Sequence, residues 1–168
     1  AVRSLKFSSV PVIGAPSGMA IGGGFEVLLH SDKIIAHTNS VLGLVESGVG
    51  LIPGGGGVKE TYLRCLTQLK NSNDAAWKTW MQIGYGQTGT SPEKSAELFY
   101  FLPERDQTEM NRDYLINAGI ALIKEINHMG YKKPQPQTIK LPGNSIINKM
   151  EEFMDNGIEK GLFYPHDK

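Results

Sequence analysis

Two glutamates are the side chains of this sequence whose type and spacing best suit chemistry. Glu26 follows the glycines 22–24, and Glu46 ends an apolar run twenty positions later. Acids are scarce here, because residues 1–57 contain only one other, Asp32. Two carboxylates that share an apolar pocket have pKa values that burial and mutual repulsion separate, so one can accept a proton while the other donates one. The pattern alone leaves open that both are solvated surface residues.

The glycines before Glu26 could supply a second chemical group. Of the twenty glycines, twelve lie between residues 14 and 57. Without Cβ atoms, Gly22 to Gly24 allow a ligand to approach the backbone, and N–H groups at a helix start have no intrahelical acceptor. Such N–H groups can form an oxyanion hole for a carbonyl oxygen that gains negative charge. Close packing of two backbones is the alternative, and the glycines alone favour it.

Two other interpretations of these residues fail on spacing. The run Gly48-Val-Gly50-Leu-Ile-Pro53 has proline where a dinucleotide fingerprint has its third glycine, and Gly57 is not followed by the Lys-Ser/Thr of a P-loop. His30, Asp32 and His37 match no strong metal-binding pattern, so we expect no metal site.

Hydrophobic patterning predicts the elements that must position the glutamates. Short apolar runs indicate strands, at residues 11–15, 33–37 and 41–45. Helical spacing and caps indicate helices, at residues 25–30, 58–64, 75–83, 91–99 and 108–129, and from Asn144 onward. Residues 48–57 should form a loop, and the prolines in 133–136 predict an extended connector.

Composition excludes several classes of protein. The 168 residues are 40% hydrophobic and 20% charged, which is typical of a globular chain. Seventeen basic and seventeen acidic residues balance, so a broad nucleic-acid-binding surface is not expected. A single cysteine, Cys65, excludes an internal disulfide and favours a cytoplasmic location. No apolar run approaches the roughly 20 residues of a membrane span.

The two glutamate-bearing blocks together resemble a known family. The blocks are Pro11-Val-Ile-Gly-Ala-Pro-Ser-Gly-Met-Ala-Ile-Gly-Gly-Gly-Phe-Glu26 and Gly43-Leu-Val-Glu-Ser-Gly-Val-Gly-Leu-Ile-Pro-Gly-Gly-Gly-Gly57. They resemble the enoyl-CoA hydratase (crotonase) family, above all the hydratase part of bifunctional fatty-acid β-oxidation proteins that also carry a 3-hydroxyacyl-CoA dehydrogenase. The resemblance implies an α/β fold, with residues 1–103 as the C-terminal half of a crotonase-type ββα spiral and residues 104–168 as a helical extension.

The resemblance also implies a reaction and roles for single residues. The family hydrates trans-2-enoyl-CoA to 3-hydroxyacyl-CoA, with two glutamates that position the water and an N–H group that binds the thioester oxygen. Glu26 and Glu46 match the glutamates, and Gly23 matches the N–H donor. Further contacts with the substrate are expected from Gly22, Gly24, Pro53 and Gly54. We expect Glu26→Gln and Glu46→Gln to lower kcat with little loss of stability.

The departures from the family pattern suggest a fragment. The first half of the spiral is not recognised, nor is the dinucleotide fingerprint of the dehydrogenase, to which NAD would belong. We therefore expect no cofactor in this segment, little activity from it alone, and a homo-oligomer or the remainder of a parent chain as partner to complete the acyl-CoA site. An isomerase of the same fold is one alternative, although isomerases generally rely on one carboxylate. A non-catalytic subunit or scaffold is the other.

Overall fold

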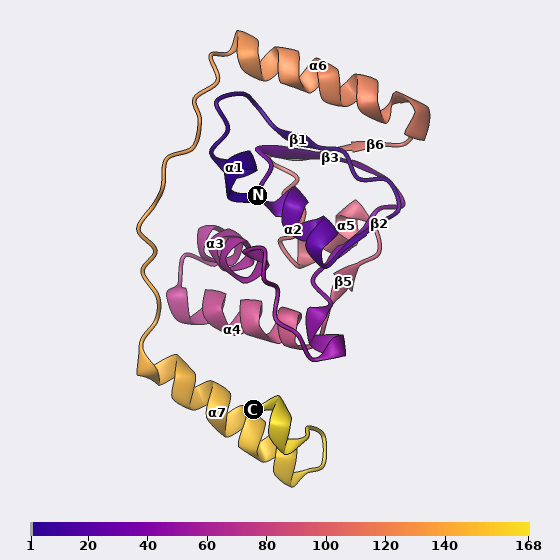
Figure 1. Ribbon diagram of the computed structural model, residues 1–168. Coiled ribbons are helices and arrows are strands. Elements are labelled where there is room, and N and C mark those ends of the chain that lie inside the picture. The colour runs from indigo at the N-terminus through magenta and orange to yellow at the C-terminus, as the bar shows by residue number, and fades with distance from the viewer. Residues whose placement is uncertain (1) are drawn as a thin grey trace.

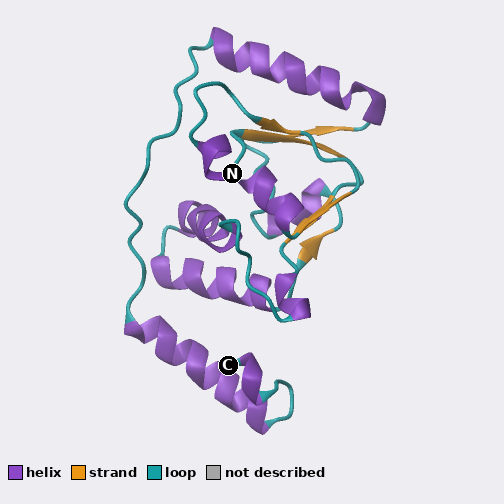
Figure 2. Ribbon diagram, in the orientation of Figure 1, coloured by secondary structure: helices purple, strands orange, loops and turns teal. Residues whose placement is uncertain are grey.

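The computed structural model describes residues 2–168, which form two small sheets surrounded by helices (Figures 1 and 2). The first sheet is entirely parallel, in the order β1 (Ile13–Gly14), β3 (Lys33–His37), β6 (Gln107–Glu109). The second has β4 (Val41–Gly43) at its centre, parallel to β2 (Met19–Ile21) and antiparallel to β5 (Thr88–Gly89). Strands β1 to β4 therefore alternate between the two sheets, whereas β4 and β5 belong to the same sheet.

Helices provide most of the remaining regular structure. The α-helices are α1 (Val2–Lys6), α2 (Gly23–Leu29), α3 (Gly57–Leu69), α4 (Ser72–Gly84), α5 (Pro92–Glu97), α6 (Leu115–His128) and α7 (Asn144–Glu159). Three short 3-10 helices are η1 (Glu46–Val49), η2 (Arg112–Tyr114) and η3 (Pro165–Asp167). Within residues 2–168, no helix combines the length and apolar content that crossing a membrane requires.

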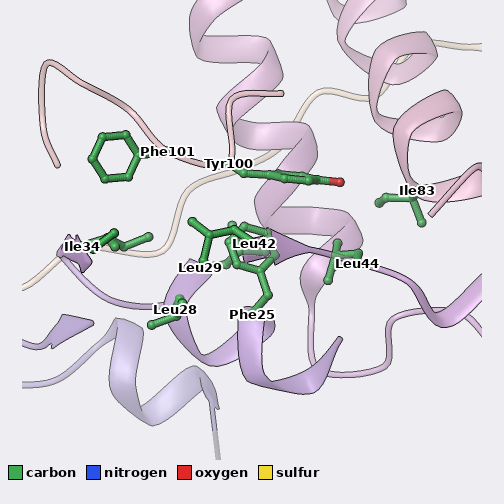
Figure 3. Close-up of a cluster of buried hydrophobic side chains, with 10 residues drawn as sticks. Phe25, Leu28, Leu29, Ile34, Leu42, Leu44, Ile83, Tyr100 and Phe101 are labelled. Atoms are coloured by element: carbon green, nitrogen blue, oxygen red, sulfur yellow. The ribbon is translucent and has the colours of Figure 1, made fainter. Parts of the chain in front are cut away.

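The main hydrophobic core lies around α2 (Figure 3). Phe25, Leu28 and Leu29 lie on one side of this helix and are buried against Leu42 of β4. The Phe25 ring meets the ring of Tyr100 edge to face, with 4.8 Å between centroids. Because α2 carries Glu26 on the same turn as Phe25, this packing fixes the start of the helix on which the first candidate residue lies.

A second helix, α6, covers the other face of the parallel sheet. Its Gly119 lies beside Ile35 of β3 and Ile13 of β1. Three successive residues of β3, Ile34 to Ala36, are buried, as expected for a parallel strand covered on both faces. The sheet is therefore enclosed between α2 and α6.

Helix α7 packs on α4 through a cluster of aromatic rings. Phe153 of α7 meets Trp77 and Trp80 of α4 edge to face, with centroids 5.5 and 5.6 Å away. Phe163, which follows α7, lies 5.7 Å from Phe153 and covers Gly157. The extended segment 130–143 connects α6 to α7 along one side of the molecule (Figure 1).

The structure confirms part of the predicted element map. The strand over 33–37 has the predicted bounds, and the Ser91 side chain caps α5 by accepting a hydrogen bond from the Lys94 N–H at 3.2 Å. The helices predicted at 25–30, 58–64 and 75–83 exist, and α3 and α4 are longer than predicted. Strands β2, β5 and β6 have only two or three residues each, too few to show an apolar period, and were not predicted.

The helix predicted over 108–129 is wrong in its first part. Residues 107–109 form β6, which pairs with β3, and α6 begins only at Leu115. Between them the Asn111 side chain accepts a hydrogen bond from the Asp113 N–H at 3.0 Å and starts η2 instead. Met110 and Tyr114, which lie four positions apart and would share the apolar face of such a helix, are 80% and 60% exposed. In α7, Gly143 is the N-cap, so Asn144, where the sequence predicted the helix to start with a cap, is the first helical residue.

The aromatic cluster between α4 and α7 leads to a stability prediction. Phe153→Ala should destabilise the fold by about 1–3 kcal/mol, because both edge-to-face contacts and their buried area are lost. Trp77 and Trp80 then gain contact with water, so tryptophan emission should shift to the red. Ile147→Ala, at a half-exposed position of the same helix, is the control. Unchanged emission in Phe153→Ala would contradict this packing.

Candidate active site

Glu26 is buried and joins α2 to the glycine-rich loop before α3. Its side chain Oε2 accepts a hydrogen bond from the Gly55 N–H at 2.9 Å, and Oε1 accepts one from the Gly57 N–H at 2.7 Å. Gly57 is the first residue of α3, whose early N–H groups have no acceptor within the helix. The glutamate therefore caps α3 from a neighbouring helix, where a negative charge also interacts favourably with the helix dipole.

The loop must be glycine where it meets this carboxylate. A Cβ at Gly55 would lie 2.5 Å from Glu26 Oε2, and one at Gly57 would lie 2.9 Å from Oε1. Either contact would push the carboxylate off the backbone N–H groups. Sequence reasoning missed both residues, although the run of four glycines immediately before a helix was a usable signal.

Glu46 lies beside Gly22, the residue that precedes α2. It begins η1, which follows β4 after Leu44 and Val45, and its Oε1 is 3.5 Å from the position that a Cβ on Gly22 would occupy. Gly22 is the residue before α2, and its carbonyl oxygen accepts the first helical hydrogen bond from the Glu26 N–H at 3.0 Å. The two glutamates thus lie near the N-terminal end of α2, one against Gly22 and one a turn later.

The two glutamates differ in how their oxygens are engaged. Both Glu26 oxygens accept backbone hydrogen bonds, whereas Glu46 Oε2 is buried and has no hydrogen-bond partner among residues 2–168. A buried carboxylate oxygen without a partner is costly, so such an atom is a place where water or a ligand group is expected to bind.

Gly23 and Gly24 leave the start of α2 open. Both are exposed, and a Cβ at either position would meet nothing within 4 Å in the described chain. Neither N–H group donates a backbone hydrogen bond within residues 2–168. The described residues therefore do not support close backbone packing as the reason for these glycines. The two N–H groups remain available to an acceptor from outside.

The other residues predicted from sequence to contact the substrate differ in their exposure to solvent. Pro53 is buried and Gly54 is exposed, in the loop that leads to Gly55. Sequence reasoning did not single out Leu51 and Ile52, which precede them and are 62% and 80% exposed. This loop thus presents apolar side chains next to the segment that holds Glu26.

The three residues considered as metal ligands form hydrogen bonds to other groups of the chain. His30 Nδ1 donates to the Glu26 carbonyl oxygen at 2.7 Å, one helical turn back. Asp32 accepts hydrogen bonds from the Val12 N–H at 2.8 Å and the Tyr131 hydroxyl at 3.1 Å. His37 accepts one from an N–H in the turn that follows it. No group of three His, Cys, Asp or Glu side chains in the described residues could hold a metal ion.

Comparison with known proteins identifies a family that matches the segment carrying both glutamates. Residues 2–72, which contain both glutamates and the glycine loop, match the family model described as enoyl-CoA hydratase/isomerase. Residues 2–72 of this chain therefore belong to the enoyl-CoA hydratase/isomerase family. The resemblance inferred from the two sequence blocks is confirmed.

Curated relatives match most of this chain but are much longer. A Bacillus subtilis protein named "Probable 3-hydroxyacyl-CoA dehydrogenase" is 38% identical over 144 residues, which are 86% of this chain and 18% of that protein. A Rickettsia felis protein whose name includes the words fatty acid oxidation complex trifunctional enzyme is 31% identical over 159 residues, 92% of this chain and 20% of that protein. The chain thus spans about a fifth of these relatives' length.

Solved structures show the same fold. An enoyl-CoA hydratase from Bacillus anthracis aligns with a TM-score of 0.56 and 24% identity, over 89% of this chain and 47% of that one. One from Mycobacterium tuberculosis aligns with a TM-score of 0.55 and 21% identity, over 92% of this chain and 49% of that one. The predicted fold class, part of a crotonase-type α/β fold, is confirmed.

The different engagement of the two glutamates predicts different costs of substitution. Glu26→Gln replaces one acceptor oxygen by an NH₂ group that faces a backbone N–H, so the fold should lose about 1–3 kcal/mol of stability. This revises the expectation of little loss for both variants. Glu46→Gln breaks no hydrogen bond of the described chain, and its change should stay within about 0.5 kcal/mol.

Urea unfolding of the two variants tests this difference. Each variant is compared with the unchanged chain, and the slope with urea concentration shows whether the unfolding transition is comparable. Equal midpoints for Glu26→Gln and Glu46→Gln would show that the bonds to Gly55 and Gly57 do not hold the loop.

Proposed function

We propose that this chain contributes the glutamate pair and one oxyanion donor to a site that hydrates trans-2-enoyl-CoA to 3-hydroxyacyl-CoA. Membership of the enoyl-CoA hydratase/isomerase family and the fatty-acid oxidation names of relatives support the general activity. The observation that carries the specific reaction is the position of Glu26 and Glu46 near one end of α2, beside the open N–H groups of Gly23 and Gly24.

Each group has a role that follows from the chemistry of water addition. Water attacks C3 of the conjugated thioester, and negative charge develops on the thioester oxygen as an enolate. A positioned N–H, assigned to Gly23, stabilises that charge by about 3–4 kcal/mol. The glutamate pair orients the water, removes its proton and delivers a proton to C2, which contributes about 10²- to 10⁴-fold in rate.

The two carboxylates have different surroundings, which suits a reaction in which one proton is removed and another is delivered. Glu26 is held by two N–H groups, and each of its oxygens retains a lone pair for a water. Glu46 has a buried oxygen free to accept a hydrogen bond. Because coupled carboxylates titrate as a pair, the proton is assigned to the pair and not to one member.

The substrate partner of this proposal is an acyl-CoA, bound in part by Gly22, Gly24, Pro53 and Gly54. Water addition changes no oxidation state, so the step requires no redox cofactor in this segment. NAD would act in the dehydrogenase region of a bifunctional protein, an activity that the Bacillus subtilis relative's name contains. The site would be completed by a second copy or by further polypeptide of a longer chain.

Hydration of crotonyl-CoA tests the proposal. We expect little turnover from the 168-residue chain. We expect turnover from a chimera in which the part of the Bacillus subtilis relative that precedes the matched region is joined upstream. In the chimera, Glu26→Gln and Glu46→Gln should each lower kcat by about 10²-fold or more, because each removes an acid–base group. Turnover is followed by loss of the enoyl-thioester absorbance.

Controls separate chemistry from folding and from the isomerase alternative. Glu151→Gln, at an exposed position of α7, should leave kcat unchanged. Circular dichroism establishes that each chimera is folded. A folded chimera without hydration, or one that only moves the double bond of a 3-enoyl-CoA, would contradict the proposed reaction.

A further inference from the structure

A pocket of about 260 Å³ lies at the opposite end of α2 from the candidate active site. It is formed where the end of α2 meets α1, α3, the loop after Leu102 and the segment 130–143. Three basic side chains, Lys6, Arg64 and Arg105, line it. The proposed hydration reaction uses none of them.

Arg64 is the unusual member of this pocket, because it is buried and forms no ion pair within residues 2–168, while Asp106 and Glu60 favour its charge without direct contact. The residue is only 6% exposed, and its Nη1 donates to the Tyr100 carbonyl oxygen at 2.9 Å. Its Nη2 is buried and has no hydrogen-bond partner in the described chain. Burial, together with the nearby Arg105, lowers the pKa of Arg64 to about 9, so the guanidinium is still charged at neutral pH.

The carboxylates around the pocket already form ion pairs or hydrogen bonds with other groups of the chain. Glu60 pairs with Lys6 and with Lys59, whose Nζ lies 2.7 Å from Glu60 Oε1. Burial disfavours its charge, but these two lysines outweigh burial and lower the pKa of Glu60. Asp32 binds an N–H group and a hydroxyl, as described above.

Asp106 is committed to Arg105 through two hydrogen bonds of 2.8 and 3.0 Å. Its oxygens also accept from the N–H groups of Ile34 and Leu102, both at 2.9 Å. No carboxylate within residues 2–168 forms an ion pair with Arg64. A buried cation without a partner is costly, and an anion bound in the pocket would remove that cost.

We propose that this pocket binds the phosphate group of a small molecule, with Arg64 as the cation that has no ion-pair partner among residues 2–168, and with Arg105 and Lys6, already paired with Asp106 and Glu60, as the other cations that line it. A guanidinium suits phosphate because its N–H groups form strong charge-assisted hydrogen bonds. The volume exceeds that of a phosphate ion, so the pocket can also hold a small organic group attached to it. The site is separate from the one that holds Glu26 and Glu46.

The segment 130–143 gives this site a structural consequence. Pro134 and Gln137 of that segment line the pocket opposite α3. A ligand there would contact both the core and the connector to α7.

Calorimetric titration of the 168-residue chain with inorganic phosphate tests the proposal. Sodium chloride keeps the ionic strength constant, and acetate in a parallel titration distinguishes phosphate from a carboxylate. We expect phosphate to bind, and Arg64→Gln to weaken binding about tenfold or more by removing this cation. Arg64→Lys should retain the charge and an intermediate affinity, and it guards against a Gln variant that does not fold.

Arg112→Gln, at an exposed position outside the pocket, is the matched control and should bind phosphate as the unchanged chain does. Failure of phosphate to bind the unchanged chain at millimolar concentration would overturn the proposal. So would equal affinity in folded Arg64→Gln, or acetate binding as tightly as phosphate.

Discussion

The hydrogen bonds from Gly55 and Gly57 to the Glu26 carboxylate are the constraint on which the candidate site depends. They connect the first turn of α2 to the loop before α3 and to the first residue of α3, across 29 and 31 positions of sequence. Phe25, the neighbour of Glu26, lies fully buried against Tyr100, so the helix that carries the carboxylate is itself fixed by the core. Core packing thus fixes the position of the Glu26 carboxylate, and the carboxylate in turn fixes the position of the loop before α3.

The same bonds allow one residue to serve both structure and chemistry. A carboxylate oxygen that accepts one N–H can still accept a water, so capping α3 does not remove Glu26 from a reaction. Preorganisation of this kind is favourable for catalysis, because a side chain that is already held need not reorganise when charge moves. Glu46 lacks such bonds on its buried Oε2, and the pair is therefore unequal before any substrate is present.

The sequence predicted best the structural features that depend on local residue patterns, and worst those that depend on contacts between residues far apart in the chain. The strand 33–37 and the Ser91 cap follow from the residues themselves, and both are confirmed. The error at 108–129 arose because β6 forms only by pairing with β3, seventy residues away in sequence, while the apolar spacing of Met110 resembles a helix. Similarly, scarcity of acids pointed to Glu26, but no pattern could show that Gly55 would bind it.

The glycines illustrate why residue type alone is ambiguous. At Gly55 and Gly57 a Cβ would collide with the Glu26 carboxylate, so the fold requires glycine there. At Gly23 and Gly24 the backbone is helical, φ is not positive, and a Cβ would meet no described atom. Alanine would favour the helix at each of these two positions by about 1 kcal/mol. Glycine there brings no packing gain among residues 2–168, and the proposed role of Gly23 as an N–H donor to the substrate gives a reason for it.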